Sequence, residues 1–326
     1  MTYDLIIIGG GPAGVAAGVY AARKKIKALL VAKEFGGQSL VSDNIENWIG
    51  SKSITGLELA EMLEGHLRAQ EGLEISEGDV VLKIERLGAA GDGTGFKVIT
   101  RDGKTYETKT VLLTVGSRRR KLGVPGEDKF EGKGVVYCST CDAPVFKGKT
   151  VAVVGAGNAA LEAVVDLFPY ADKIYLVHRS EVLKGDPVTQ EEVMSNLKVQ
   201  LVLNAEIAEI IGENLVEKLR YKDKKTGEVK EIGVQGVFVE IGSMPNSEMV
   251  KDLVELNERG EVVVNHKTQA ASEKGIWAAG DIADVLYKQN NISAGDAVKA
   301  VLNVYDYLKS LARPAAKTAI AEEGLN

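Results

Sequence analysis

Residues 5–14, Leu-Ile-Ile-Ile-Gly-Gly-Gly-Pro-Ala-Gly, indicate the fold class of this chain. The apolar residues predict a strand buried on both faces, as in a parallel sheet, and the alanine-rich run 15–25 after the glycines predicts a helix. Glycine at Gly9 permits a tight turn, Gly11 lets phosphate oxygens approach the backbone, and Gly14 lets helix and strand pack closely. The stretch therefore predicts a dinucleotide-binding loop. We expect its ligand contacts at Gly9, Gly11, Pro12, Ala13 and Gly14.

The same order of strand, glycine loop and helix recurs in the second half of the chain. Thr150–Val154 predicts a strand, residues 155–160 form the loop Gly-Ala-Gly-Asn-Ala-Ala, and a helix from Leu161 precedes the predicted strand Lys173–Val177. Two such units predict two Rossmann-like domains in an α/β protein. We expect a second dinucleotide at Gly155, Gly157, Asn158, Ala159 and Ala160.

Length and composition agree with this division. At 326 residues two domains are the natural expectation, and a net charge of −6 argues against a general nucleic-acid-binding protein. The apolar start has no basic region before it, and no run of about 18 apolar residues could span a membrane. We therefore expect a cytoplasmic protein.

The two cysteines of the chain lie three positions apart, at Cys138 and Cys141. A protein of this length without further cysteines is not built on a disulfide framework, so the pair predicts half of a metal site or a redox dithiol. Tetrahedral zinc needs four ligands, and none of the three histidines stands at ligand spacing from the pair, which leaves zinc as the minor alternative. In a redox dithiol one sulfur attacks a disulfide and the second resolves the mixed disulfide. Asp142, beside Cys141, could carry a proton.

Shorter patterns predict further strands and a last helix. Strands are expected at 80–84, 96–100, 105–108, 111–115, 201–203, 215–221, 229–232, 237–242 and 276–281. A helix is expected at 293–311, with a buried face formed by Ala297, Val298, Val301, Leu302, Tyr305 and Leu308. The residues after Pro314 do not continue this apolar face and predict a frayed tail.

Taken in order, these motifs resemble those of the low-molecular-weight thioredoxin reductases and of the reductase core of the alkyl hydroperoxide reductase flavoprotein. The resemblance covers about residues 3–312 and rests on GGGPAG, Gly36-Gly37-Gln38, Glu46-Asn47, CSTCD, GAGNAALE, FVEIGSMPN, AAGDI and Tyr287-Lys288-Gln289. It implies two three-layer ββα nucleotide-binding domains, the second inserted in the first. The FAD-binding domain would comprise residues 1–116 and 246–326, and the NAD(P)H-binding domain, with the dithiol, residues 117–245.

The resemblance implies that the first glycine loop binds the FAD pyrophosphate. It places Gln38 and Asn47 near the flavin, Asp281 at the ribitol and phosphate region, and Gln289 near the ring at the start of the last helix. Gly280 and Lys288 lie beside these residues in sequence and complete the expected FAD site. Glu34 is a weaker candidate for the ribose-binding acid of Rossmann domains. One departure is Glu46-Asn47-Trp48-Ile49-Gly50, which lacks the proline of the family's usual E-N-x-P-G turn.

Nucleotide specificity is expected just after the strand 173–177. Family members that use NADPH have His-Arg-Arg and a distal basic residue here, because guanidinium groups suit a 2′-phosphate. This chain has His178-Arg179-Ser180 and then Lys184, so two cations remain and Glu181 is the acid that could favour NADH. We expect NADPH, with NADH as the alternative.

By the same resemblance, Cys141 faces the flavin, Cys138 attacks the substrate disulfide, and Asp142 is the acid or base for the leaving thiol. The implied activity is that of a thioredoxin-disulfide reductase, and the implied assembly is a homodimer. The Ser-Thr spacer and the following Ala143-Pro144 depart from the commoner C-A-T-C-D-G.

Several alternatives stay open. The closest is an NADH-dependent reductase of a glutaredoxin-like carrier that feeds a peroxiredoxin. Residues 35–38, Tyr137-Cys138 and residues 287–289 favour this branch. Because no thioredoxin-like domain precedes the first strand in this sequence, we expect a separate carrier. A ferredoxin-linked thioredoxin reductase and a non-catalytic flavin-binding redox sensor are the remaining alternatives.

Overall fold

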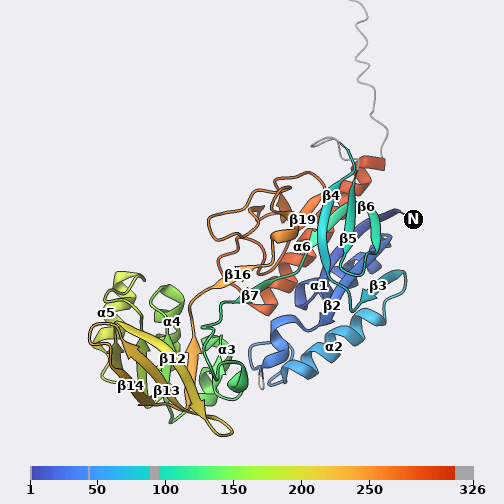
Figure 1. The fold of residues 1–326 in the computed structure, drawn as a ribbon. Helices are drawn as coiled ribbons and strands as arrows, with labels where there is room; N and C mark the ends of the chain where they lie inside the picture. Colours follow the sequence, from blue (N-terminus) through green and yellow to red (C-terminus); the bar gives the residue numbers. More distant parts are fainter. Residues whose placement is uncertain (1, 43–44, 89–94, 313–326) are drawn as a thin grey trace, which may run out of the picture. The chain divides into compact units, whose positions relative to one another are not determined.

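The computed structural model of this chain describes residues 2–42, 45–88 and 95–312. It shows an α/β protein whose chain divides into two compact units. The first comprises Met1–Gly37, Leu63–Gly116 and Asn246–Asn326, and the second comprises Gln38–Met62 and Ser117–Pro245. In Figure 1 the yellow segments belong to the second unit, and the red helix belongs to the first. The predicted tail after Pro314 lies outside the described residues.

The first unit is built on a mainly parallel sheet in the order β17-β18-β19-β6-β1-β2-β3. The core strands β19, β6, β1, β2 and β3 are parallel, whereas β17, β18, β4 and β5 join in antiparallel pairs. The elements are β1 (Thr2–Gly10), α1 (Pro12–Arg23), β2 (Ala28–Phe35), β3 (Leu73–Glu77), β4 (Val81–Arg86), β5 (Phe96–Thr100), β6 (Thr105–Leu113), β17 (Val264–Asn265), β18 (Ala270–Ala271), β19 (Ile276–Ala278) and α6 (Asn290–Ala312).

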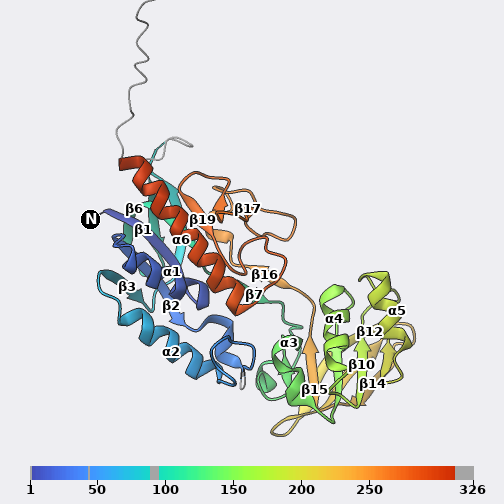
Figure 2. The same ribbon diagram turned by 180° about the vertical axis from the view of Figure 1, so that it is seen from behind.

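Strand β1 is buried because layers cover both faces of this sheet. Ile6 and Ile8 pack into a core with Phe96 and Val98 of β5. On the other face α1 lies against β1, and α6 runs along α1, as Figure 2 shows. Helix α2 (Gly56–Arg68) spans the division between the units. The continuous apolar run of β1 is thus explained by burial on both sides.

The second unit has the same three layers. Its parallel sheet has the order β11-β10-β9-β15-β8, and an antiparallel sheet β12-β13-β14 and a ribbon of β16 and β7 accompany it. The elements are β7 (Ser117–Arg119), β8 (Val135–Val136), α3 (Ser139–Asp142), β9 (Thr150–Val154), α4 (Asn158–Leu167), β10 (Lys173–Val177), α5 (Pro187–Ser195), β11 (Val199–Val202), β12 (Ala205–Gly212), β13 (Val216–Asp223), β14 (Val229–Gly233), β15 (Gly236–Val239) and β16 (Ser243–Pro245).

Alternate residues of the parallel strands face the two outer layers of this unit. Val153 of β9 packs with Val164 of α4 in one core, and Ala152 packs with Leu219 of β13 in the other. The predicted three-layer ββα architecture is therefore confirmed, with helices on one face and an antiparallel sheet on the other.

Several local expectations were wrong. Residues 105–108 and 111–115 are not two strands, because β6 runs unbroken from Thr105 to Leu113. Its first half pairs antiparallel with β5, and the strand then continues between the parallel partners β1 and β19. Where the pairing partners of β6 change, its sequence changes from alternating polar and apolar residues to a continuous apolar run. This change made one strand look like two. Strand β12 and helices α2 and α5 lay outside the predicted elements.

The predicted buried face of helix α6 is confirmed in part, because Ala297 and Val301 are buried and Val298, Tyr305 and Leu308 are partly buried. Ala300 and Val304 are buried as well, whereas Leu302 is exposed. Small residues face inward because α6 packs closely on α1. None of the helices in the described ranges combines the length and the apolar character needed to cross a bilayer.

Candidate active site

The glycines of the first loop have separate tasks. A Cβ on Gly9, whose φ is +117°, would lie 2.4 Å from the carbonyl oxygen of Thr114, and one on Gly14 would lie 1.8 Å from that of Gly9. A Cβ on Gly11 would have only the Gly37 Cα, at 4.0 Å, within reach. Gly9 and Gly14 therefore allow β1, β6 and α1 to pack, and Gly11 leaves an open cradle before the helix.

The second loop has the same division of tasks. A Cβ on Gly155 would lie 2.4 Å from the carbonyl oxygen of Glu240, whereas one on Gly157 would meet nothing within 4 Å. The side-chain oxygen of Asn158 accepts a hydrogen bond of 2.8 Å from the backbone N–H of Asp186, which holds the loop after β10 against this one.

Both cradles fit the phosphates of a dinucleotide. Helix α1 begins at Pro12 and α4 at Asn158, each directly after its loop and each without an acid in its first turn. The open backbone N–H groups and the positive end of the helix dipole favour an anion there. The first cradle would hold FAD and the second a nicotinamide nucleotide, with Pro12, Ala13, Ala159 and Ala160 in the adjoining helical turns.

The predicted specificity residues follow β10 as expected. Arg179 and Lys184 are exposed, and their charged groups have no partner among the described residues. His178 is partly buried, and its Nε2 atom is buried without a hydrogen-bond partner among those residues. Burial, with the nearby charges of Lys184 and Arg179, lowers the pKa of this imidazole. A neutral imidazole and two free cations suit a phosphorylated ribose.

The loop also holds the acid that would oppose a 2′-phosphate. Glu181 is exposed, and its carboxylate forms a 2.6 Å ion pair with Lys225 on the hairpin between β13 and β14. Its charge is thus partly compensated. The Ser180 carbonyl oxygen accepts a backbone hydrogen bond from Asn204.

The two cysteines are joined in a disulfide at the end of β8, with Cα atoms 5.4 Å apart. Cys138 stands directly before α3, and Cys141 lies within it. Ser139 Oγ, between the cysteines, donates a hydrogen bond of 2.8 Å to Asp166 of α4. Asp142 is partly buried, and its backbone N–H donates to the Cys138 carbonyl oxygen at 3.1 Å.

Tyr137, the residue before the disulfide, is held in place by the carboxylate of Glu127. The Tyr137 hydroxyl donates to Glu127 at 3.0 Å, and Glu127 also accepts from the backbone N–H groups of Leu122 and Gly123. Burial and the Glu127 charge raise the pKa of Tyr137. This anchor supports the strand that presents Cys138.

Sequence reasoning missed Glu240. It directly follows β15, which lies between β8 and β9 in the parallel sheet, so its carbonyl meets the Gly155 turn while its side chain is hydrogen-bonded by the Ser139 backbone. The signal was present in the run Val237-Phe238-Val239-Glu240, where an acid follows buried apolar residues.

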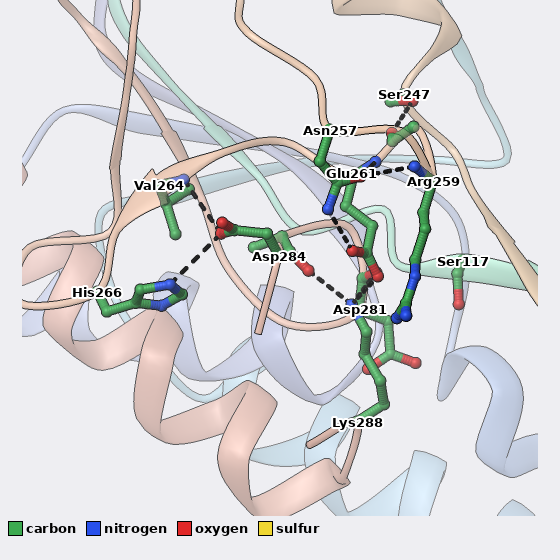
Figure 3. A network of polar contacts seen from close by, with 12 residues as sticks. Ser117, Ser247, Asn257, Arg259, Glu261, Val264, His266, Asp281, Asp284 and Lys288 are labelled. Carbon is green, nitrogen blue, oxygen red and sulfur yellow. Dashed lines mark hydrogen bonds and ion pairs between the residues drawn. The ribbon is translucent and has the colours of Figure 1, made fainter. Parts of the chain in front are cut away.

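Lys288 holds the loop that follows β19 and contains Asp281, as Figure 3 shows. Its ammonium donates to the carbonyl oxygens of Asp281 (3.1 Å) and Ala283 (2.6 Å) and pairs with Glu261 at 2.9 Å. These three contacts match the three N–H donors of an ammonium group, so Lys288 holds the backbone of this loop in place. The Gln289 carbonyl accepts from Ser293 in the first turn of α6.

The remaining predicted FAD residues are dispersed. Glu34 is exposed on β2 beside Lys33, at 3.4 Å. Gly280 has a φ of +76° and packs on Ser293. Gln38 donates to the Ser117 carbonyl oxygen at 2.8 Å, and Gln38 and the exposed Asn47 both belong to the second unit.

Two dinucleotide cradles and a disulfide on a parallel sheet define a class of redox protein. Residues 3–300 match the family described as pyridine nucleotide-disulphide oxidoreductase, and the chain belongs to this family. The family implies FAD and a nicotinamide cofactor.

Known relatives narrow the comparison. The chain is similar to an alkyl hydroperoxide reductase subunit from Xanthomonas campestris pv. phaseoli, with 39% identity over 98% of this chain and 60% of that protein. It is 41% identical to a Bacillus subtilis protein named NADH dehydrogenase, over 94% of this chain and 58% of that protein. It thus spans about three fifths of the length of these relatives.

Among solved structures, thioredoxin reductase from Streptococcus pyogenes superposes with a TM-score of 0.86 at 34% identity, covering 95% of this chain and 99% of that one.

Proposed function

We propose that this protein is a flavin-dependent disulfide oxidoreductase, a thioredoxin-disulfide reductase. Electrons would pass from NAD(P)H through FAD and the Cys138–Cys141 pair to the disulfide of a thioredoxin-like protein. One observation carries the proposal: a C-x-x-C disulfide and an open glycine loop lie at the same edge of one parallel sheet. The overall reaction consumes NAD(P)H, one proton and a disulfide, and yields NAD(P)⁺ and two thiols.

The residues of the chain divide this work. When bound, FAD supplies two-electron transfer between the nicotinamide and the protein disulfide. Cys141 would be the sulfur that faces the flavin, and Cys138 would attack the disulfide of the carrier. Asp142 would give a proton to the leaving thiol and take one back in the next cycle. The Tyr137–Glu127 hydrogen bond supports the backbone from which Cys138 acts.

NADPH is the proposed donor. The unpartnered charges of Arg179 and Lys184, among the described residues, favour a 2′-phosphate, and Lys225 partly compensates the acid of the same loop, Glu181. The proposed partner is a separate thioredoxin- or glutaredoxin-like protein, and the proposed setting is a homodimer in a reducing cytosol, where a dithiol can cycle.

Anaerobic titration of the flavoprotein with NADPH and, separately, NADH tests this proposal. We expect NADPH to bleach the flavin faster, and subsequent addition of a thioredoxin disulfide to restore the colour. If dithionite reduces the flavin but neither nucleotide does, the nicotinamide-dependent function is wrong and a ferredoxin-linked reductase takes its place.

A second candidate is an NADH-dependent reductase of a carrier that feeds a peroxiredoxin. Two observations favour it: Ser180 replaces the second arginine, and the similarity to an alkyl hydroperoxide reductase protein covers almost the whole chain. Turnover with a glutaredoxin-like carrier, compared with turnover on thioredoxin, separates the two candidates. Faster reduction of the glutaredoxin-like carrier with NADH would favour the second.

A further inference from the structure

Glu240 is a buried acid that the proposed electron path does not use. The residue is 9% exposed, and it follows the buried residues Val237, Phe238 and Val239 of β15. An apolar residue would cost less free energy there, since a buried carboxylate loses its hydration. Acids retained in such places often serve a reaction rather than the fold.

The position of Glu240 connects it to the disulfide. The backbone of Ser139, the residue between Cys138 and Thr140, donates a hydrogen bond to the Glu240 carboxyl. Strand β15 pairs in parallel with β8, so Glu240 and Cys138 emerge from neighbouring strands at the same edge of the sheet. The backbone of the redox loop is therefore in direct contact with this acid.

The charges around Glu240 do not strongly favour its ionised form. Arg119 of β7 is the cation that faces it and favours the charged form, while Asp166 of α4 and Asp142 of α3 oppose that form. Desolvation is the largest influence, and together these effects raise the pKa of Glu240 to about 7. Near neutral pH both the protonated and the ionised form of Glu240 are therefore populated.

We propose that Glu240 is a positioning residue that takes up one proton when the Cys138–Cys141 disulfide is reduced. Reduction breaks the S–S bond and adds two electrons and one proton, which leaves one thiol and one thiolate. A thiolate beside a charged Glu240 would place two negative charges at the same redox loop. Proton uptake by Glu240 removes one of them, so the second proton of the reduction rests on the carboxyl group until the carrier disulfide is attacked.

This inference rests on the proposed redox role of the cysteines, yet it can be tested without nucleotide or carrier. The full-length flavoprotein would be equilibrated in dithiothreitol redox buffers between pH 6 and 8.5, and its free thiols trapped by alkylation and counted by mass. Wild type, Glu240→Gln, Glu240→Asp and Glu162→Gln would be compared. Glu162 is an exposed acid on α4 of the same unit and controls for loss of one charge.

Above pH 7, we expect the equilibrium constant for disulfide reduction to depend more steeply on pH in wild type than in Glu240→Gln. The difference should be up to about tenfold per pH unit, which is the effect of one additional proton taken up on reduction. Glu240→Asp should restore part of this dependence, and Glu162→Gln should match wild type. Identical pH dependence in wild type and a folded Glu240→Gln variant would overturn the proposal.

A second measurement uses wild type alone, so it tests the proposal even if Glu240→Gln does not fold. Infrared difference spectra of wild type, reduced minus oxidised at pH 7.5, should show a new band from a protonated carboxyl group. Absence of that band would also sink the proposal. Failure of NADPH turnover, in contrast, would count against the proposed function and leave this result untouched.

Discussion

Cys138 and Cys141 have distinct predicted tasks, although one disulfide joins them. We expect Cys138→Ser and Cys141→Ser each to lower turnover with a carrier disulfide at least about 100-fold, because exchange needs both an attacking and a resolving sulfur. Turnover assays with NADPH and thioredoxin check this, and nucleotide-dependent flavin bleaching should persist in both variants. Full activity in either variant would refute the dithiol mechanism.

Arg179 is the residue on which nucleotide choice should depend. Its guanidinium has no partner among the described residues, so it is free to bind a 2′-phosphate. Arg179→Ala should raise KM for NADPH about tenfold, the effect of one hydrogen bond to a charged group. KM for NADH should change little. An equal rise for both nucleotides would show that Arg179 does not read the 2′-phosphate.

Glu240 should make stability depend on pH. Its pKa rises from 4.5 to about 7 on folding, so the folded state binds the proton more tightly than the unfolded chain. The free energy of unfolding therefore falls as pH rises from 4.5 to 7, by an amount on the order of 3 kcal/mol. Urea unfolding at pH 5 and pH 8 should show Glu240→Gln gaining stability relative to wild type only at pH 8. A constant difference would contradict the raised pKa.

At the scale of elements, one structural rule places the candidate site of the second unit. Strands β8, β15, β9 and β10 are parallel, so their carboxyl ends meet at one edge of the sheet. The disulfide, Glu240, the GAGNAA loop and His178 follow these four strands in turn. Each residue is therefore positioned by a strand buried on both faces.

Helix α1 packs on β1 through Gly14, and a matched pair of variants can separate packing from binding. Gly14→Ala would place a Cβ 1.8 Å from the Gly9 carbonyl oxygen, and we expect a loss of about 2–3 kcal/mol in the free energy of unfolding. Gly11→Ala, with an open neighbourhood, should change stability by less than about 0.5 kcal/mol but lower FAD affinity. Denaturant unfolding of the apoproteins and FAD titration measure the two effects. Equal stability of the two variants would contradict this division.

At the scale of the whole molecule, the chain passes between its two compact units at four points. Beside two of them, β7 and β16 form an antiparallel ribbon, flanked by Gly116 and Gly242. In the thioredoxin reductases that the sequence resembles, the nucleotide domain rotates so that the flavin meets the nicotinamide and the dithiol in turn, and we expect the same rotation here. Rotation needs short segments that can change their dihedral angles.

Gly242 is the position to test for such a hinge. Its φ is +98°, and a Cβ there would meet nothing within 4 Å, so Gly242→Ala acts on backbone freedom and not on packing. We expect turnover to fall several-fold while the flavin content stays normal. Gly227→Ala, in a hairpin with φ +77° and equally open surroundings, is the matched control and should keep wild-type turnover. If the two variants behave alike, Gly242 is not a hinge.

Local sequence patterns predicted the two β-α-β units and the redox dithiol, and the family resemblance predicted the three-layer architecture. Glycine spacing and apolar runs are local signals, and each specifies its own turn, strand or helix. The continuity of β6, part of the buried face of α6 and the position of Glu240 beside Ser139 depended on tertiary structure. Each of these depends on which distant segment becomes a neighbour, and for Glu240 that neighbour is the parallel strand β8, about a hundred residues earlier in the chain.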